Sequence, residues 1–199
     1  MRGRPPTRRS GTRLRIGVFG GSFDPIHHGH LIAACSLADT LALDEVRMVV
    51  ARSQPLKPAG HVASPEDRGA MLELALEGDE RLRADTRELT RDGPSYTVDT
   101  LRALRAERPG AELVLLLGSD AAAELPRWRE PETIRSLCRV EQFTRAGAGN
   151  SGLTVPWMEI SSTEIRARVR AGRGIRYWVP EAVAGYIAAH RLYREGQEQ

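Results

Sequence analysis

For most of its length the chain alternates between segments patterned as β-strands and segments patterned as amphipathic helices. The run "ELVLLLGSD" at 112–120 is apolar on successive positions, as expected of a strand covered on both faces. Such alternation predicts an α/β fold with a doubly wound, mostly parallel sheet and helices on both faces. We expect strands at 14–20, 46–51, 112–120, 139–147 and 153–160, and helices at 30–43, 64–78, 97–110, 130–138, 161–172 and 180–193.

The length of 199 residues suits one well-filled domain and is short for two. The hydrophobic fraction of 41% and the charged fraction of 28% are ordinary for a globular protein. We expect a disordered arginine-rich tail at 1–13, a single folded domain at 14–194 and a short tail at 195–199.

The basic charge is concentrated at the N-terminus. Residues 1–15 hold six arginines and no acid, so 23 of the 29 basic residues remain for the rest of the chain against 26 acidic ones. A mildly acidic body predicts no nucleic-acid partner. The apolar run after Arg8 and Arg9 is too short for an export signal, and no segment reaches the length of a membrane span. With Cys35 and Cys138 expected as buried thiols, we expect a cytoplasmic protein without a membrane partner.

Ligands of such sheets bind beyond the carboxyl ends of the strands, where the strand order reverses. The segments that would meet there are Gly20 to His30, the loop after Ala51, and Gly118 to Asp120. We expect the functional site among them.

The first of these segments belongs to the run "GVFGGSFDPIHHGH", which begins at Gly17. Gly20 and Gly21 would let a bulky anion approach the strand end, where the amides of the following helix also point. His27 and His30 stand three residues apart, so both can reach one side of the helix start. The run predicts a phosphate site.

Two other interpretations explain these histidines less well. A zinc site lacks a convincing third ligand nearby, since Asp24 precedes a proline in a turn and is expected to accept backbone amides. Helix capping would account for one histidine but not for two around Gly29. We expect no metal on the protein side chains.

A second group of anion-binding residues lies near the C-terminus, in "ISSTEIRARVRAG". Ser161 and Glu164 form a capping-box pattern, which alone predicts only a helix start. Ser162 and Thr163 add hydroxyls to the free amides there, and Arg166 follows one turn later. This helix start is a second candidate phosphate site.

Both groups resemble motifs of one nucleotidyltransferase superfamily. Residues 21–30 match GxFDPxHxGH at every fixed position, and residues 160–166 match ISSTxIR. In that superfamily the histidines bind the triphosphate and stabilise charge on the α-phosphate, and ISSTxIR closes over the β- and γ-phosphates of ATP. The resemblance implies His27, His30 and Arg166 as catalytic residues. It implies ATP-binding roles for Gly20, Gly21, Ser22, Phe23, His27, His30, Gly118, Asp120, Ser161, Ser162, Thr163 and Arg166.

From residue 16 to residue 193 the chain resembles bacterial nicotinate-nucleotide adenylyltransferases. The further matching segments are "GPSYTVDTL", "GSD", "RW" and "IRYWVPEAVAGYIAAHRLY". The resemblance implies a Rossmann-like domain in which Tyr96 and Thr97 approach the nicotinate ring and its carboxylate and Trp128 stacks on the ring. Apart from the motif, Trp128 would be interpreted as an amphipathic surface aromatic.

Several positions depart from the family pattern. "SQPLKP" has Leu56 where a histidine is usual, although Lys57, the only lysine of the chain, suits a phosphate. Ser119 replaces a commoner alanine. Arg145 resembles an arginine that faces phosphate, and Ala146 stands in place of the usual proline. The substrate-binding residues implied are Lys57, Tyr96, Thr97, Trp128 and Arg145.

The activity implied is transfer of the adenylyl group of ATP to nicotinate mononucleotide, with release of pyrophosphate, in NAD synthesis. Mg²⁺ is implied as the cofactor, held mainly by phosphate oxygens and water. Nicotinamide mononucleotide and phosphopantetheine are alternative acceptors. A nucleotide-binding regulatory module without catalysis is an alternative of another class, and a homo-oligomer stays open.

Overall fold

The computed structural model describes residues 13–53, 60–145, 153–156 and 158–194, and its centre is a parallel six-stranded sheet. The strand order is β3-β2-β1-β4-β5-β6, and every neighbouring pair is parallel. The predicted doubly wound α/β class is confirmed. The strands are β1 (Arg15–Gly21), β2 (Glu45–Val50), β3 (Leu82–Asp85), β4 (Glu112–Gly118), β5 (Arg139–Arg145) and β6 (Leu153–Val155).

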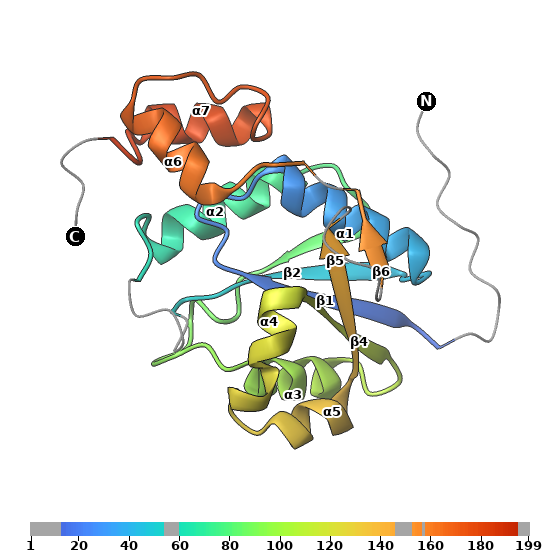
Figure 1. The fold of residues 1–199 in the computed structure, drawn as a ribbon. Coiled ribbons are helices and arrows are strands. Elements are labelled where there is room, and N and C mark those ends of the chain that lie inside the picture. Colours follow the sequence, from blue (N-terminus) through green and yellow to red (C-terminus); the bar gives the residue numbers. More distant parts are fainter. Residues whose placement is uncertain (1–12, 54–59, 146–152, 157, 195–199) are drawn as a thin grey trace.

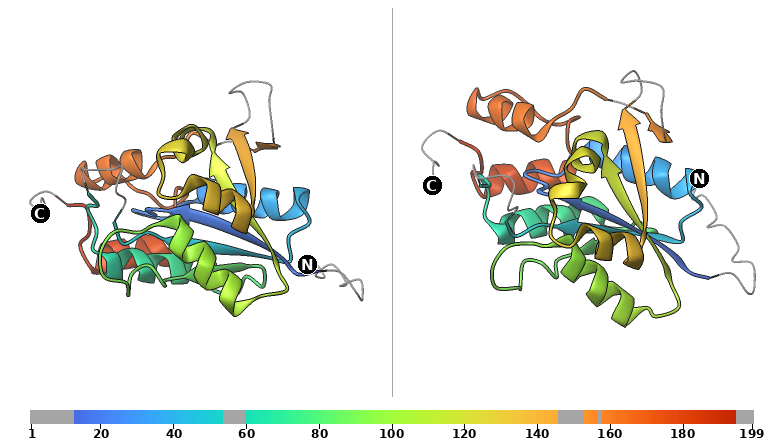
Figure 2. Two further views of the ribbon diagram at one scale, coloured as in Figure 1. Left: turned by 90° about the horizontal axis from the view of Figure 1, so that it is seen from below. Right: turned by 60° about the horizontal axis from the view of Figure 1, so that its bottom comes forward.

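Helices cover both faces of the sheet (Figures 1 and 2). On one face lie α1 (His28–Thr40), α2 (Pro65–Leu76), α6 (Ser162–Arg170) and α7 (Glu181–Ala189). On the other lie α3 (Thr97–Glu107), α4 (Ser119–Glu124), the 3₁₀ turn η1 (Leu125–Arg127) and α5 (Pro131–Leu137).

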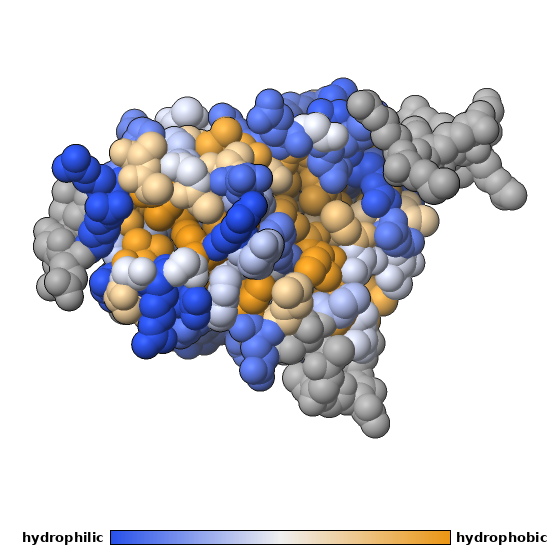
Figure 3. All heavy atoms as spheres, turned by 90° about the horizontal axis from the view of Figure 1, so that it is seen from above, coloured by the Kyte–Doolittle hydropathy of each residue, from blue (hydrophilic) through white to orange (hydrophobic). Residues whose placement is uncertain are grey.

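The sheet separates two hydrophobic cores. On β4, Val114 and Leu116 pack into the core of α1, α2, α6 and α7, whereas Leu113, Leu115 and Leu117 pack into the core of α3 and α5. Successive strand side chains point to opposite faces, so a continuous apolar run fills both cores at once. Seen from above, hydrophobic residues gather over the middle of the face, with hydrophilic residues around its rim and a few among them (Figure 3).

Local signals explain where helices begin. Ser64 is the N-cap of α2, its Oγ accepting the Asp67 amide at 3.0 Å, and Pro65 occupies the first helical position, as predicted. Ser161 caps α6 in the same way, accepting the Glu164 amide at 3.1 Å. The sequence pattern therefore predicted both helix starts correctly.

Some boundaries differ from the predictions. β3 was not predicted, because a four-residue edge strand containing Arg83 has too short an apolar pattern. β6 ends at Val155 instead of residue 160, where Pro156 has no amide to continue a ladder. α4 begins at Ser119, where the strand predicted at 112–120 was expected to continue, because the alanines of "SDAAAE" favour a helix.

Two further predictions from the sequence concern the chain ends and the burial of the cysteines. Arg13 donates a hydrogen bond from Nε to the Gly110 carbonyl at 2.8 Å; residues 1–12 and 195–199 lie outside the described residues. Cys138 is buried as expected, but Cys35 is only half-buried, and both thiols are free. Within the described ranges, every helix is too short or too polar to cross a membrane.

Candidate active site

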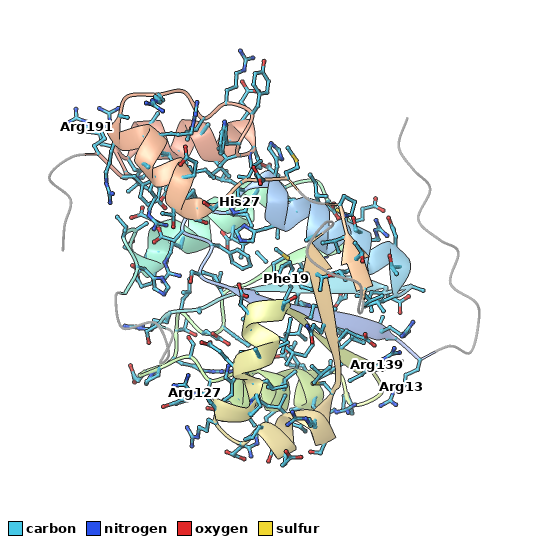
Figure 4. All side chains as sticks on the ribbon, in the orientation of Figure 1. Arg13, Phe19, His27, Arg127, Arg139 and Arg191 are labelled. Atoms are coloured by element: carbon cyan, nitrogen blue, oxygen red, sulfur yellow. The ribbon has the colours of Figure 1, made fainter. Side chains whose placement is uncertain are left out.

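Strand order reverses between β1 and β4, and the carboxyl ends of these two strands begin the candidate site. Gly21 ends β1 and Gly118 ends β4. Figure 4 shows His27 at the start of α1, below α6, with Phe19 of β1 beneath it. The three predicted ligand-binding segments thus begin at the carboxyl ends of the neighbouring parallel strands β1, β2 and β4, which lie at the same edge of the sheet.

The two motif histidines lie against each other. The rings of His27 and His30 are stacked, with centroids 3.7 Å apart and an interplanar angle of 26°. Phe23 meets His30 edge to face at 5.2 Å. His27 is 5% exposed, so its imidazole is held by packing before any ligand arrives. The spacing argument, that both rings reach one side of the helix start, is confirmed.

Glycines make room for these rings. A Cβ on Gly29 would lie 3.0 Å from Nδ1 of His27, and one on Gly21 would lie 2.7 Å from the Phe23 ring. A Cβ on Gly20 would meet nothing within 4 Å, so protein packing alone does not require a glycine there. The open space beside Gly20 fits the expected approach of a ligand to the strand end.

Two observations bear on the alternative interpretations of the histidines. His27 is the N-cap residue of α1, yet its side chain makes no capping hydrogen bond. Among the described residues, no group of three or more His, Cys, Asp or Glu side chains could hold a metal ion. The capping interpretation therefore does not fit His27, and the absence of a metal on the protein side chains stays a prediction.

Asp24 anchors the β1–α1 loop. Its carboxylate is buried and accepts the amides of Val62 (2.8 Å) and Ala63 (3.2 Å) and the hydroxyl of Tyr193 (2.8 Å). The prediction that Asp24 accepts backbone amides is confirmed. With three donors around it, this carboxylate is occupied by the protein itself.

Arg68 supports the same loop from α2. Its guanidinium is fully buried and donates to four backbone carbonyls. Burial lowers the pKa of Arg68, and the nearby Asp24 charge offsets part of that effect. The four acceptors are the carbonyls of Ser22, Ala51, Arg52 and Ala63.

The second motif docks directly on the first. Ser162 Oγ donates to the Pro25 carbonyl at 2.9 Å, and Arg166 Nη1 donates to the Asp24 carbonyl at 2.7 Å. Arg166 also reaches Thr163 Oγ1 from Nη2 at 3.4 Å. The structure therefore brings together two motifs that lie more than a hundred residues apart in sequence, with the N-terminus of α6 next to the histidine loop.

The end of β4 contributes a third segment to the candidate site. Gly118 is the N-cap residue of α4, and Asp120 is exposed in its first turn. Ser119 Oγ donates to the Phe143 carbonyl of β5 at 3.3 Å, which joins two strand ends. Asp120 is therefore open to a ligand at the carboxyl edge of the sheet.

The residues expected near the nicotinate ring lie around the start of α3. Tyr96 is the N-cap residue and Thr97 the first residue of α3. The Arg129 guanidinium lies over the Tyr96 ring, 4.7 Å from its centroid. Trp128 is half-buried against the core of α3 and α5. This partial burial is what an amphipathic surface aromatic would show.

Two predicted residues cannot be placed. Lys57 lies outside the described residues, and so does Leu56 beside it. Arg145 is the last residue of β5, but its side chain is not described. The expected phosphate contacts of Lys57 and Arg145 stay predictions.

Known proteins are similar to this chain in sequence and in fold. A cytidylyltransferase-like family matches residues 18–168 of this chain. A probable nicotinate-nucleotide adenylyltransferase of Thermus thermophilus is 46% identical over 188 residues, covering 91% of this chain and 100% of the relative. One of Gemmatimonas aurantiaca is 42% identical over 198 residues, covering 92% and 93%. This chain belongs to the nicotinate-nucleotide adenylyltransferase family.

Solved structures agree on the fold of this family. The Plasmodium falciparum nicotinic acid mononucleotide adenylyltransferase, complexed with NaAD, superposes with a TM-score of 0.73 at 19% identity and covers 90% of this chain and 97% of its own. A putative nicotinate-nucleotide adenylyltransferase of Vibrio parahaemolyticus has a TM-score of 0.69 at 20% identity, covering 92% and 98%.

Some residues that shape the site of this family member were not predicted from the sequence. Arg68 stands in the buried pattern of α2, four residues before Leu72, and a charged residue at a core position was the available signal. Tyr193 gave no signal beyond being aromatic. The carbonyl of Trp178, which accepts the His28 amide at 3.1 Å, is a backbone group and invisible in side-chain identities.

Proposed function

We propose that this protein transfers the adenylyl group of ATP to nicotinate mononucleotide, giving nicotinate adenine dinucleotide and pyrophosphate in NAD synthesis. Membership of the adenylyltransferase family supports the reaction class. The observation that carries the proposal is the contact of the two phosphate-binding motifs, through Ser162 with Pro25 and Arg166 with Asp24. This contact puts a helix N-terminus and a guanidinium next to the imidazole pair, as a bound triphosphate requires.

The proposed reaction is a direct displacement. A phosphate oxygen of nicotinate mononucleotide forms a bond to the α-phosphorus of ATP, and the bond from that phosphorus to the bridging oxygen of the β-phosphate breaks. The electron pair leaves with pyrophosphate. His27 and His30 stabilise the charge that develops on the α-phosphate, while Arg166 and the amides of α6 hold the β- and γ-phosphates.

The hydroxyl of Ser162 has a structural part in this proposal. Its proton is donated to the Pro25 carbonyl, so its Oγ–H holds α6 in place, and the free amides at the helix start remain for phosphate. Arg166 has five N–H groups and uses two nitrogens in the contacts described above, which leaves donors for an anion.

Mg²⁺ enters this proposal with the nucleotide. Asp24 is buried beneath three donors and the described residues form no cluster of metal ligands. A resident metal centre on these side chains does not fit. Phosphate oxygens and water would carry the ion, as part of the ATP substrate.

The reaction is tested by pyrophosphate release. With ATP and Mg²⁺, we expect turnover with nicotinate mononucleotide and little with nicotinamide mononucleotide or phosphopantetheine. A strong preference for the amide or for phosphopantetheine would replace the proposed acceptor, and no turnover with any of the three would favour a non-catalytic module.

The role of the imidazoles is tested by H27A and H30A. Each loses a preorganised donor, and we expect turnover to fall by about 10²–10³. H190A is the control, since His190 is exposed at the end of α7 and stacks on Tyr186 instead of on the motif. Full turnover in the H27A/H30A double variant would contradict the mechanism.

A further inference from the structure

We propose that Tyr193, next to the end of the described chain, is a positioning residue for the histidine loop, acting through Asp24. The inference rests on the proposed function and adds to it a contact between the C-terminal segment and the catalytic motif. Tyr193 itself does not touch the expected ligand; it acts on the residue that holds the loop.

The Tyr193 hydroxyl donates to Asp24 from a buried position. Its side chain is 1% exposed, and its hydroxyl lies 2.8 Å from Asp24 Oδ1. Burial raises the pKa of Tyr193, and the Asp24 charge raises it further, so the phenol keeps its proton. A protonated phenol facing a carboxylate is a strong, permanent donor.

The backbone also turns this side chain inward. Tyr193 has a φ of 63° and Arg191 a φ of 55°, the left-handed region that bulky residues avoid. Such conformations persist when the surrounding structure over-determines them. Here the burial of Leu192 and Tyr193 in the core of α1, α2, α6 and α7 holds the chain in this turn.

Asp24 transmits the contact to both phosphate-binding motifs. Its carboxylate is the acceptor of Tyr193, and its backbone carbonyl is the acceptor of Arg166. The next carbonyl, of Pro25, accepts Ser162, and His27 follows two residues later. A shift of Asp24 would therefore displace the anchor of α6 and the start of the imidazole pair together.

The test compares Y193F with Y186F. Both changes remove one phenol hydroxyl that donates to a carboxylate on the same face of the molecule. Tyr186 of α7 donates to Asp67 Oδ1 at 2.9 Å, which joins α7 to α2 rather than to the histidine loop. Y186F thus matches the chemistry of the lost hydrogen bond but leaves Asp24 untouched.

We expect Y193F to lower kcat about tenfold or more, because small displacements of catalytic groups are costly in rate. The KM for nicotinate mononucleotide should change less than twofold, and thermal stability should fall more in Y193F, whose hydroxyl is buried, than in Y186F, whose side chain is half-buried. Y186F should keep the wild-type kcat. Equal kcat values in Y193F and wild type, or equal losses in Y193F and Y186F, would overturn the proposal.

A second measurement does not need the reaction. Hydrogen exchange at the Val62 and Ala63 amides, which donate to Asp24, and the Kd for ATP without acceptor can be read on each protein. Faster exchange and weaker ATP binding in Y193F alone would support the positioning role even if wild type released no pyrophosphate, which would overturn only the proposed function. Unchanged exchange and Kd in Y193F would contradict the positioning role.

Discussion

Single atoms decide the geometry of the imidazole pair. The stacked rings of His27 and His30 need Gly29 between them, because a Cβ at that position would press on the His27 ring at 3.0–3.1 Å. Gly29 is the second residue of α1 and its φ lies outside the left-handed region. The requirement for glycine is therefore one of space beside His27, and not of backbone conformation.

G29A should separate catalysis from folding. Alanine is the better helix former, so α1 loses nothing in propensity, while the His27 ring must move by a few tenths of an ångström. We expect kcat to fall about tenfold with little change in melting temperature. G185A in α7 is the control, since a Cβ there meets nothing within 4 Å. Unchanged kcat in G29A would mean that the ring position is not critical.

Among the elements, α6 is the one whose position brings the second motif to the β1–α1 loop. Its N-terminus is capped by Ser161, as the sequence predicts, but its position over the β1–α1 loop depends on Ser162 and Arg166. A capping box specifies that a helix starts, whereas the two carbonyls that receive Ser162 and Arg166 specify where it lies.

S162A should loosen this docking. Loss of the bond to Pro25 is expected to cost about 1 kcal/mol of unfolding free energy and to raise the KM for ATP several-fold, since the helix amides lose their fixed place. S136A removes a similar bond, from Ser136 Oγ to the Thr133 carbonyl on α5, and should leave the KM for ATP unchanged. Urea unfolding and initial rates measure the two effects, and equal KM values in both variants would refute the docking role.

Across the whole molecule, Arg68 joins segments that the sequence keeps far apart. Its guanidinium donates to carbonyls after β1, after β2 and before α2, on the side of the sheet where the site lies. No apolar side chain could donate to these four carbonyls, two of which belong to the buried residues Ala51 and Ala63, so this charge is kept in the core despite its desolvation.

R68M should be severely destabilising. It leaves four backbone carbonyls without their donor and removes the positive charge near buried Asp24. We expect a loss of about 3–5 kcal/mol in unfolding free energy. R83M on β3 is the control, because Arg83 is exposed, and should change stability by less than about 0.5 kcal/mol. Urea denaturation of both variants gives the comparison. A loss in R68M no larger than in R83M would show that the network is dispensable.

Much of this protein follows from local sequence. Periodic apolar patterns determined the alternation of strands and helices, and Ser64, Pro65 and Ser161 determined helix starts, because capping depends on residues within one turn. The two motifs for which we propose phosphate binding could also be recognised from the sequence, since each places its donors within ten residues or fewer. β3, β6 and α4 were misjudged where short segments carry too few residues for a period to appear.

Only the tertiary structure decided what holds the motifs together. Arg68 reaches the Ser22 carbonyl across 46 residues, and Tyr193 reaches Asp24 across 169. The carbonyls of Asp24, Pro25 and Trp178 make their contacts as backbone groups. Side-chain identity states which donors a segment has, but not which distant acceptor the fold will place beside them. The sequence by itself thus determined which chemical groups the candidate site holds, and the packing of the sheet and its C-terminal helices determined how those groups are arranged.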